Sequence, residues 1–98
     1  MLLEWDPVKD RQNLAKHGLS FDTARLVFDD PHALSVQDRM VEGEERWQTL
    51  GMLGGIVVVL VAHTYREERG VEVIRIISAR KATPRERRAY EEGHQEAV

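Results

Sequence analysis

The sequence contains no cysteine, and this absence excludes both a disulfide framework and a zinc site built on thiolates. It also lacks a long hydrophobic run. The longest, from Ile56 to Ala62, has seven residues, whereas a membrane-spanning helix needs about 20. Residues 1–6 lack the basic start and apolar stretch of a signal peptide. We therefore expect a soluble, cytoplasmic protein without a membrane partner.

An excess of positive charge is missing as well. The 98 residues carry 14 Lys and Arg against 17 Asp and Glu, a net charge of −3, which argues against a broad nucleic-acid-binding surface. Between residues 80 and 88, however, five basic residues stand against the single acid Glu86. The basic ones are Arg80, Lys81, Arg85, Arg87 and Arg88. A local basic patch on an acidic body predicts a focused anion site. The alternative is a solvated helix with mixed charges.

The length suits one domain over residues 1–98. A short strand over residues 2–5 is followed by a helix that starts at Asp6–Pro7 and ends at Lys16 or His17, before Gly18. Ser20 is the expected cap of a second helix, which stops at residues 29–31. The core positions expected on that helix are Phe21, Ala24, Val27 and Phe28.

The rest of the chain has the pattern of strands and one last helix. Strands are predicted over residues 33–37, 45–52, 56–64 and 71–80, with 56–64 central, and residues 38–44 form a hairpin loop. The last helix starts in a capping box at residues 83–86. These elements predict an α+β fold: two N-terminal helices on one face of a twisted, mainly antiparallel sheet of about four strands, plus a C-terminal helix.

A set of short motifs extends in a fixed order from Glu4 to Tyr90. They are Glu4–Trp5–Asp6–Pro7, Lys9, Asn13, Lys16–His17–Gly18, Ser20–Phe21, Ala24, Val27–Phe28, Glu45–Arg46, Gly51, Leu60–Val61, Thr64, Arg66, Arg75–Ile76–Ile77–Ser78–Ala79–Arg80–Lys81–Ala82, Glu86–Arg87 and Tyr90. With them the chain resembles the BrnT toxins of bacterial toxin–antitoxin systems. The resemblance implies a small RNA-cleaving toxin with a RelE-like fold. It also implies a BrnA-type antitoxin with a ribbon-helix-helix domain, a heterotetrameric complex, and operator DNA bound only through the antitoxin.

RNA cleavage without a metal needs a base for the 2′-hydroxyl, positive charge on the phosphorane-like transition state, and an acid for the leaving oxygen. Arg80 is the first candidate for the phosphate clamp, because it stands at a strand end and its fork can hold two phosphate oxygens. A structural ion pair, with Glu45 or Glu86, is the alternative. Lys81 and Arg46 are the candidates for additional charge. The alternatives are an exposed lysine for Lys81 and an ion pair with Glu44 or another acid for Arg46. No cofactor is expected.

Three further side chains could position or transfer a proton or stack on a base. Tyr90 lies in the last helix, where RelE-like toxins place a functional tyrosine, but it could equally pack that helix on the sheet. His17 is the preferred imidazole, although its position also suits a helix end. His63 lies in the apolar run and has the pattern of a core histidine.

The remaining arginines are expected to bind RNA or a partner. They are Arg66, Arg75, Arg85, Arg87 and Arg88. Arg75 and Arg80 are an odd number of residues apart, so a regular strand would direct them to opposite faces. No metal site is expected, because Asp29, Asp30 and Asp38 do not have ligand spacing.

Two other functions compete with an RNA-cleaving toxin. The chain could be a non-catalytic co-repressor that strengthens the grip of an antitoxin on operator DNA. It could also be a structural adaptor domain.

Overall fold

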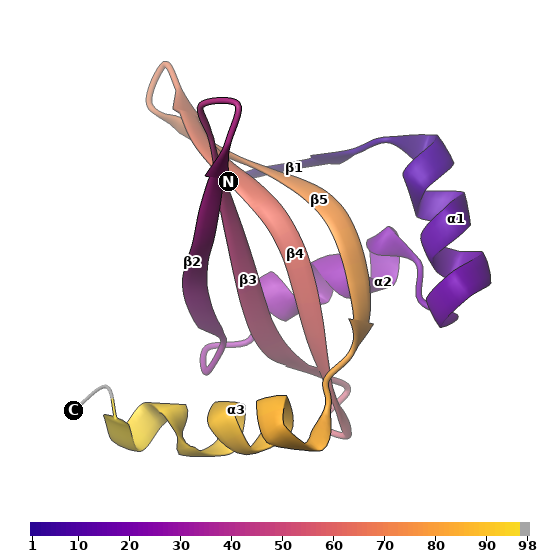
Figure 1. Cartoon of the computed structure of the whole chain (residues 1–98), viewed down its shortest axis with the longest axis vertical. Coiled ribbons are helices and arrows are strands. Elements are labelled where there is room, and N and C mark those ends of the chain that lie inside the picture. The colour runs from indigo at the N-terminus through magenta and orange to yellow at the C-terminus, as the bar shows by residue number, and fades with distance from the viewer. Residues whose placement is uncertain (97–98) are drawn as a thin grey trace.

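The computed structural model describes the backbone of residues 1–96 and the side chains of residues 1–93. Five strands form one sheet in the order β1-β5-β4-β3-β2 (Figure 1). β1 runs parallel to β5, and the other neighbours are antiparallel. The elements are β1 (Leu2–Trp5), α1 (Pro7–His17), α2 (Phe21–Ala24), the 3₁₀ helix η1 (Arg25–Asp29), β2 (Leu34–Val41), β3 (Glu44–Leu53), β4 (Val57–Glu68), β5 (Val71–Lys81) and α3 (Pro84–Glu96).

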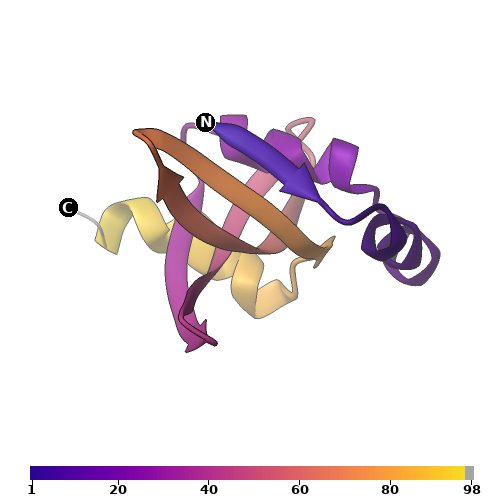
Figure 2. The same ribbon diagram turned by 90° about the horizontal axis from the view of Figure 1, so that it is seen from above.

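The α+β class is confirmed, but two details of the expected arrangement are wrong. The sheet has five strands rather than about four, because β1 pairs with β5 instead of standing apart. The second helix is a single turn, α2, that tightens into η1. Figures 1 and 2 show α2 against one face of the sheet and α3 against the other, with α1 beside the β5 edge. We call the face that carries α2 the helix face and the opposite one the open face.

The expected helix ends are confirmed by their hydrogen bonds. The Asp6 carboxylate accepts from the amide of Val8, and Gly18 adopts the left-handed conformation (φ 69°) past the end of α1. At α3, the amide of Glu86 donates to Thr83 Oγ1, while the amide of Thr83 donates to Glu86 Oε1. These are short-range interactions, which is why the sequence predicts them. Within the described residues, no helix is long and apolar enough to cross a membrane.

Each face of the sheet has its own apolar cluster. On the helix face, Phe21, Ala24 and Val27 are fully buried against strands β3, β4 and β5, as predicted. Gly51 of β3 permits this close packing, because a Cβ there would stand 2.5 Å from Val27 Cγ1. On the open face, Tyr90 of α3 packs on a smaller cluster. Its buried members are Leu50, Val58 and Leu60. α3 therefore covers only one end of the open face.

The predicted loop over residues 38–44 is wrong. β2 continues to Val41, and the turn consists only of Glu42 and Gly43, whose φ angles are 52° and 79°. Two positive φ values are typical of the tight turn whose twist matches a hairpin. The polar residues before it belong to β2, in which the register shifts at Asp38. An edge strand tolerates such polar residues, so composition alone misplaced the boundary.

Candidate functional site

A β-bulge in β5 decides which side chains share the open face. Ala62 pairs with Ser78 and His63 pairs with Ile76, so Ile77 is one extra residue in β5. Ile76 and Ala79 both enter the helix-face core. Their neighbours Arg75 and Arg80 therefore both lie on the open face. The expectation of opposite faces is wrong, because alternation is interrupted between them.

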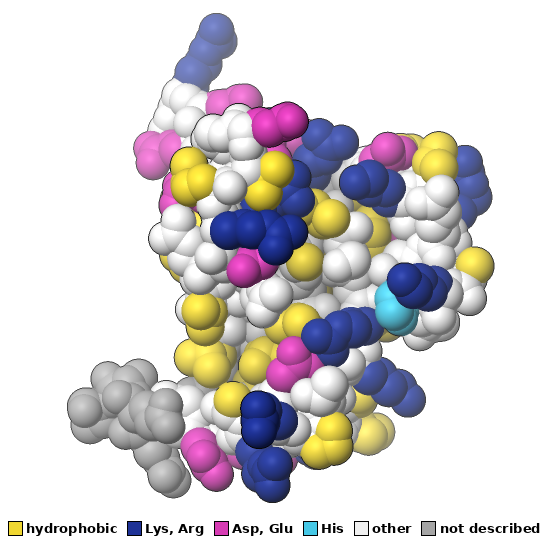
Figure 3. Space-filling model, viewed as in Figure 1, with side chains coloured by type: hydrophobic (Ala, Val, Ile, Leu, Met, Phe, Trp, Pro, Cys, Tyr) yellow, Lys and Arg dark blue, Asp and Glu magenta, His cyan; other side chains and the backbone are white. Residues whose placement is uncertain are grey.

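The open face carries a cross-strand row of basic side chains. Arg39 of β2 pairs with Arg46 of β3, and Arg46 pairs with Thr64 of β4. The register on both sides of Thr64 places Arg75 of β5 opposite it. We call Arg39, Arg46, Thr64 and Arg75 the arginine row. Figure 3 shows dark-blue side chains gathered over the sheet on this face. Like charges placed side by side on neighbouring strands destabilise a sheet, so the arginine row is not explained by its contribution to stability.

Two polar atoms of the arginine row are buried without a hydrogen bond. They are Thr64 Oγ1 and Arg46 Nε. Thr64 is 1% exposed, and Arg46 Nε has only the Glu44 carboxylate 3.5 Å away. Among the described residues no carboxylate lies within ion-pair distance of Arg75. Unsatisfied buried polar groups are rare in folded proteins, so these two atoms set the row apart from the rest of the sheet.

A polar cavity of about 290 Å³ lies beside the Arg39 and Arg46 end of the row, and the β5 bulge forms one of its borders. Ile77 and Ser78 line this cavity together with Arg39 and Arg46, and they also line a second one of about 250 Å³ beside α1. The basic residues of the second cavity are Lys9, Lys16 and His17. The fold thus places His17 across the bulge from the arginine row, beside Ile77 and Ser78 of β5.

Arg80 stands at the α3 end of the open face and is held by Glu86. Its Nη1 and Nη2 donate to the two carboxylate oxygens at 2.8 and 3.0 Å. The bond from Arg80 lowers the pKa of Glu86 to about 2, and the same pair raises the pKa of Arg80. The geometry is that of the structural ion pair considered as the alternative for Arg80. Its side chain is nevertheless 38% exposed and adds charge to this face.

Tyr90 uses its hydroxyl to attach α3 to the loop before β2. The hydroxyl donates to Asp30 Oδ2 at 2.6 Å, and the same oxygen accepts from the amide of Met52. Burial and this bond raise the pKa of Tyr90 to about 12. Burial alone would raise the pKa of Asp30, but hydrogen bonds from Tyr90, Met52 and His32 lower it. The tyrosine is 6% exposed, so this geometry is that of a packing residue.

His63 belongs to the helix face and is part of a hydroxyl chain. Its Nδ1–H donates to the carbonyl of Thr64 at 2.9 Å, which leaves Nε2 to accept from the Thr49 hydroxyl at 2.7 Å. Thr49 in turn accepts from Ser35 at 2.8 Å. Burial lowers the pKa of His63, which keeps the ring neutral. It fits the core histidine that its apolar surroundings predicted.

The other predicted binding residues are dispersed. Arg66 lies on the open face and pairs with Glu4 and Glu68, both at 2.9 Å. Lys81 follows Arg80 on β5 and therefore lies on the helix-face side of the strand, exposed. The three arginines of α3 are also exposed, and one of them pairs with Glu91. They are Arg85, Arg87 and Arg88.

Sequence reasoning missed the roles of Arg39, Thr64 and Asn13. Arg39 was assigned to a loop, and a threonine in an apolar strand gives no signal of its own. Asn13 of α1 donates to the carbonyl of Ala79 at 2.8 Å and accepts from its amide at 3.1 Å. β1 pairs with β5 only as far as Ile76. Beyond that point the Asn13 side chain supplies the hydrogen bonds that a neighbouring strand would give to Ala79, just after the bulge. Only its place among the motifs singled it out.

Among the described residues, no three His, Asp or Glu side chains are grouped as metal ligands would be. Asp30 is engaged by Tyr90 and Met52, and Asp38 lies at the β2 bulge.

Comparison with known proteins gives one family and one fold. A model of the family described as "Ribonuclease toxin, BrnT, of type II toxin-antitoxin system" matches residues 5–86. The chain is also similar to the crystal structure of the ribonuclease toxin BrnT of Brucella abortus, with 24% identity and a TM-score of 0.64. That match covers 85% of this chain and 99% of the other, and it shows the shared fold. No curated protein matches.

Proposed function

This chain belongs to the family of BrnT ribonuclease toxins of type II toxin–antitoxin systems, and from that premise we propose that it is a metal-independent endoribonuclease. It cuts RNA on the open face of its sheet, in the cytoplasm, and so arrests translation and growth. The observation that carries the proposal is the arginine row with its unpaired buried Thr64 hydroxyl. A phosphate is the ligand that such a set of donors suits best.

The attack of a 2′-hydroxyl on the adjacent phosphate produces a transition state with additional negative charge on its oxygens. Arg46 and Arg75 flank Thr64 on neighbouring strands, so two guanidinium groups and a hydroxyl stand side by side on the open face. Strand positions hold these donors before RNA binds, which is the condition for electrostatic stabilisation. We assign the phosphate clamp to these three side chains.

His17 is our candidate for proton transfer, because its cavity adjoins the row at Ile77 and Ser78. The RNA strand would then run from Arg39 across the sheet and over the bulge towards α1. Arg80 adds positive charge at the other end while its pair with Glu86 fixes α3. Tyr90 positions α3 through Asp30. Lys81 would bind flanking phosphates beyond the strand end.

The partner follows from the same family assignment. We propose a BrnA-type antitoxin with a ribbon-helix-helix domain, joined with this chain in a heterotetramer that contacts operator DNA through the antitoxin. The arginines of α3 and the pair-bound Arg66 are available to that partner or to RNA. The family description, which names a toxin–antitoxin system, supports an antitoxin as the partner.

The test is cleavage of a defined RNA by the purified chain in the presence of EDTA. We expect products that end in a 2′,3′-cyclic phosphate and a 5′-hydroxyl, because the 2′-oxygen is the nucleophile. The same sequence with 2′-O-methyl groups is the matched control and should stay intact. Cleavage of the methylated strand, or no cleavage of RNA with or without ribosomes, would contradict the proposal.

A further inference from the structure

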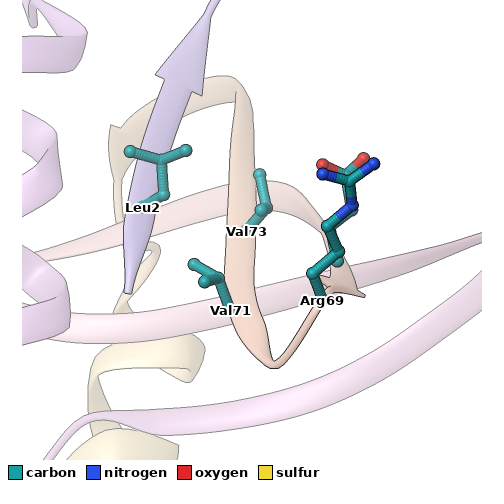
Figure 4. A pocket seen from close by; sticks show the side chains of 5 residues that line it. Leu2, Arg69, Val71 and Val73 are labelled. Atoms are coloured by element: carbon teal, nitrogen blue, oxygen red, sulfur yellow. The ribbon is translucent and has the colours of Figure 1, made fainter.

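An apolar groove lies on the open face at the end opposite to α3. Its volume is about 630 Å³, and its lining residues are Leu2, Glu68, Arg69, Val71 and Val73. Figure 4 shows Leu2 on β1 and Val71 and Val73 on β5, with Arg69 at the turn between β4 and β5. Leu2 and Val73 are also register partners. The groove is therefore built by the pairing of β1 with β5.

The walls of this groove are more exposed than apolar side chains normally remain in a folded domain. Leu2 is 54% and Val71 is 47% exposed, while Val73 forms a floor that is 2% exposed. β1 pairs only with β5, so its other edge offers free backbone groups among the described residues. A patch of this kind beside an open strand edge marks a protein interface.

Two arginines border the groove on the side of the arginine row, in addition to the Glu68 and Arg69 of its lining. Arg66 is the register partner of Val73, and Arg75 follows Val73 by two residues on the same face of β5. Two strand residues span about 6.6 Å. A segment that places apolar side chains in the groove would therefore bring its next side chains over Arg66 and Arg75. Arg66 already pairs with Glu4 and Glu68. Arg75 has no carboxylate within ion-pair distance among the described residues, so a carboxylate of a partner would complement its guanidinium.

Two other occupants fit this surface poorly. RNA offers phosphates to the arginines but no aliphatic side chain to the groove. A second copy in a two-fold contact would bring the same patch, and thus the same arginines, against each other. A protein segment with apolar and acidic residues satisfies both parts of the surface.

We propose that the antitoxin binds here through an amphipathic segment, with its apolar side chains in the Leu2–Val71–Val73 groove and a carboxylate on Arg75. Inhibition then follows directly, because the segment covers the Arg75 end of the arginine row. The location of the docking surface is independent of the reaction, but its inhibitory effect rests on the proposed function.

The experiment uses the purified BrnA-type antitoxin proposed above as the probe. Leu2→Asp/Val71→Asp places two charges in the groove at half-exposed positions, where the fold should tolerate them. Ile56→Asp is the matched control, because Ile56 is 78% exposed in the turn between β3 and β4. We expect the Kd for the probe to rise about 30-fold or more in the groove variant, as at a hot spot. The control should stay within about twofold of the wild type.

Cleavage of RNA by both variants should equal that of the wild type when no antitoxin is present, and it should resist antitoxin only in the groove variant. If circular dichroism shows the aspartate variant unfolded, Leu2→Ala/Val71→Ala serves instead, with a smaller rise in Kd. A Kd unchanged in the folded groove variant overturns the inference, as does the absence of a complex with the wild type. Two further results would overturn it: a wild-type dimer that the groove substitutions disrupt, or a loss of RNA binding in the groove variant.

The affinity measurement contains no RNA. A chain that binds the probe through the groove but cleaves nothing would refute the proposed function and leave the docking surface in place. A chain that cleaves RNA but binds the probe normally after the groove substitutions would refute the docking surface and leave the proposed function in place.

Discussion

Arg75 and Arg80 lie on the same face of β5, although their positions differ by five and a regular strand would direct their side chains to opposite faces. The cause is the extra residue Ile77, which the register of Ala62 and His63 with β5 identifies. One inserted residue thus adds Arg75 to the face that already carries Arg46 and Arg80. This face carries the proposed RNA site, and substitutions can test the contribution of each of its side chains.

The arginine row should be required for cleavage but not for folding. We expect Arg75→Ala to reduce the rate of RNA cleavage about 10²–10³-fold, as the loss of one charge donor typically does. Because Arg75 is exposed, the free energy of unfolding should change by less than about 0.5 kcal/mol. Single-turnover cleavage and urea denaturation measure the two effects. Arg25→Ala, on η1, is the matched control, and equal activity of the two variants would remove the row from the mechanism.

Thr64→Val should separate stability from activity. The Thr64 hydroxyl is buried without a partner, so its removal should raise the free energy of unfolding by about 1 kcal/mol. Cleavage should fall about 10-fold, because the hydroxyl is a proposed phosphate donor. In the control Thr49→Val, a hydroxyl bonded to Ser35 and His63 is lost, which should cost about 1–3 kcal/mol and leave cleavage intact. A destabilised Thr64→Val protein would show that the hydroxyl has a partner.

Tyr90→Phe distinguishes a packing tyrosine from a catalytic one. The substitution removes the bond to Asp30 but keeps the ring in its cluster, so we expect a loss of about 1 kcal/mol in unfolding free energy. Cleavage under conditions where the variant is folded should stay within about threefold of the wild type. Thermal unfolding and initial cleavage rates test this. A drop of about 100-fold in a folded variant would assign the hydroxyl to the reaction instead.

The pair of Glu86 with Arg80 should make stability depend on pH in a defined window. The pKa of Glu86 is lowered from its ordinary 4.5 to about 2 in the folded state, so the ionised carboxylate stabilises the fold above pH 4.5. That contribution is lost as the pH falls from 4.5 to 2. Glu86→Gln keeps an acceptor for the Thr83 amide but loses the charge.

Because the two side chains are 38% and 26% exposed, the variant should lose about 1 kcal/mol at pH 7. Urea denaturation of both proteins between pH 2 and pH 7 measures the difference, which should approach zero at the acid end. A difference that does not vary with pH would mean that the amide disturbs packing rather than charge.

The sequence by itself determined the features that arise from neighbouring residues. Asp6, Ser20 and the capping box at Thr83–Glu86 define helix starts through bonds that span two or three residues. The apolar run of β4 and the helical spacing of Phe21, Ala24 and Val27 identify the core in the same way. These interactions recur wherever the local pattern occurs, so they were predictable.

Only the tertiary structure decided which charges share a face. Asn13 and Ala79 are 66 residues apart, and Tyr90 and Asp30 are 60 apart. Such contacts depend on how the strands align, and each bulge changes that alignment by one residue. The rule of alternating side chains therefore predicted the wrong face at Ile77, and polarity wrongly predicted a loop at residues 38–41. Both predictions failed because a bulge is a feature of two paired strands. The arginine row exists only after four strands have paired in one register.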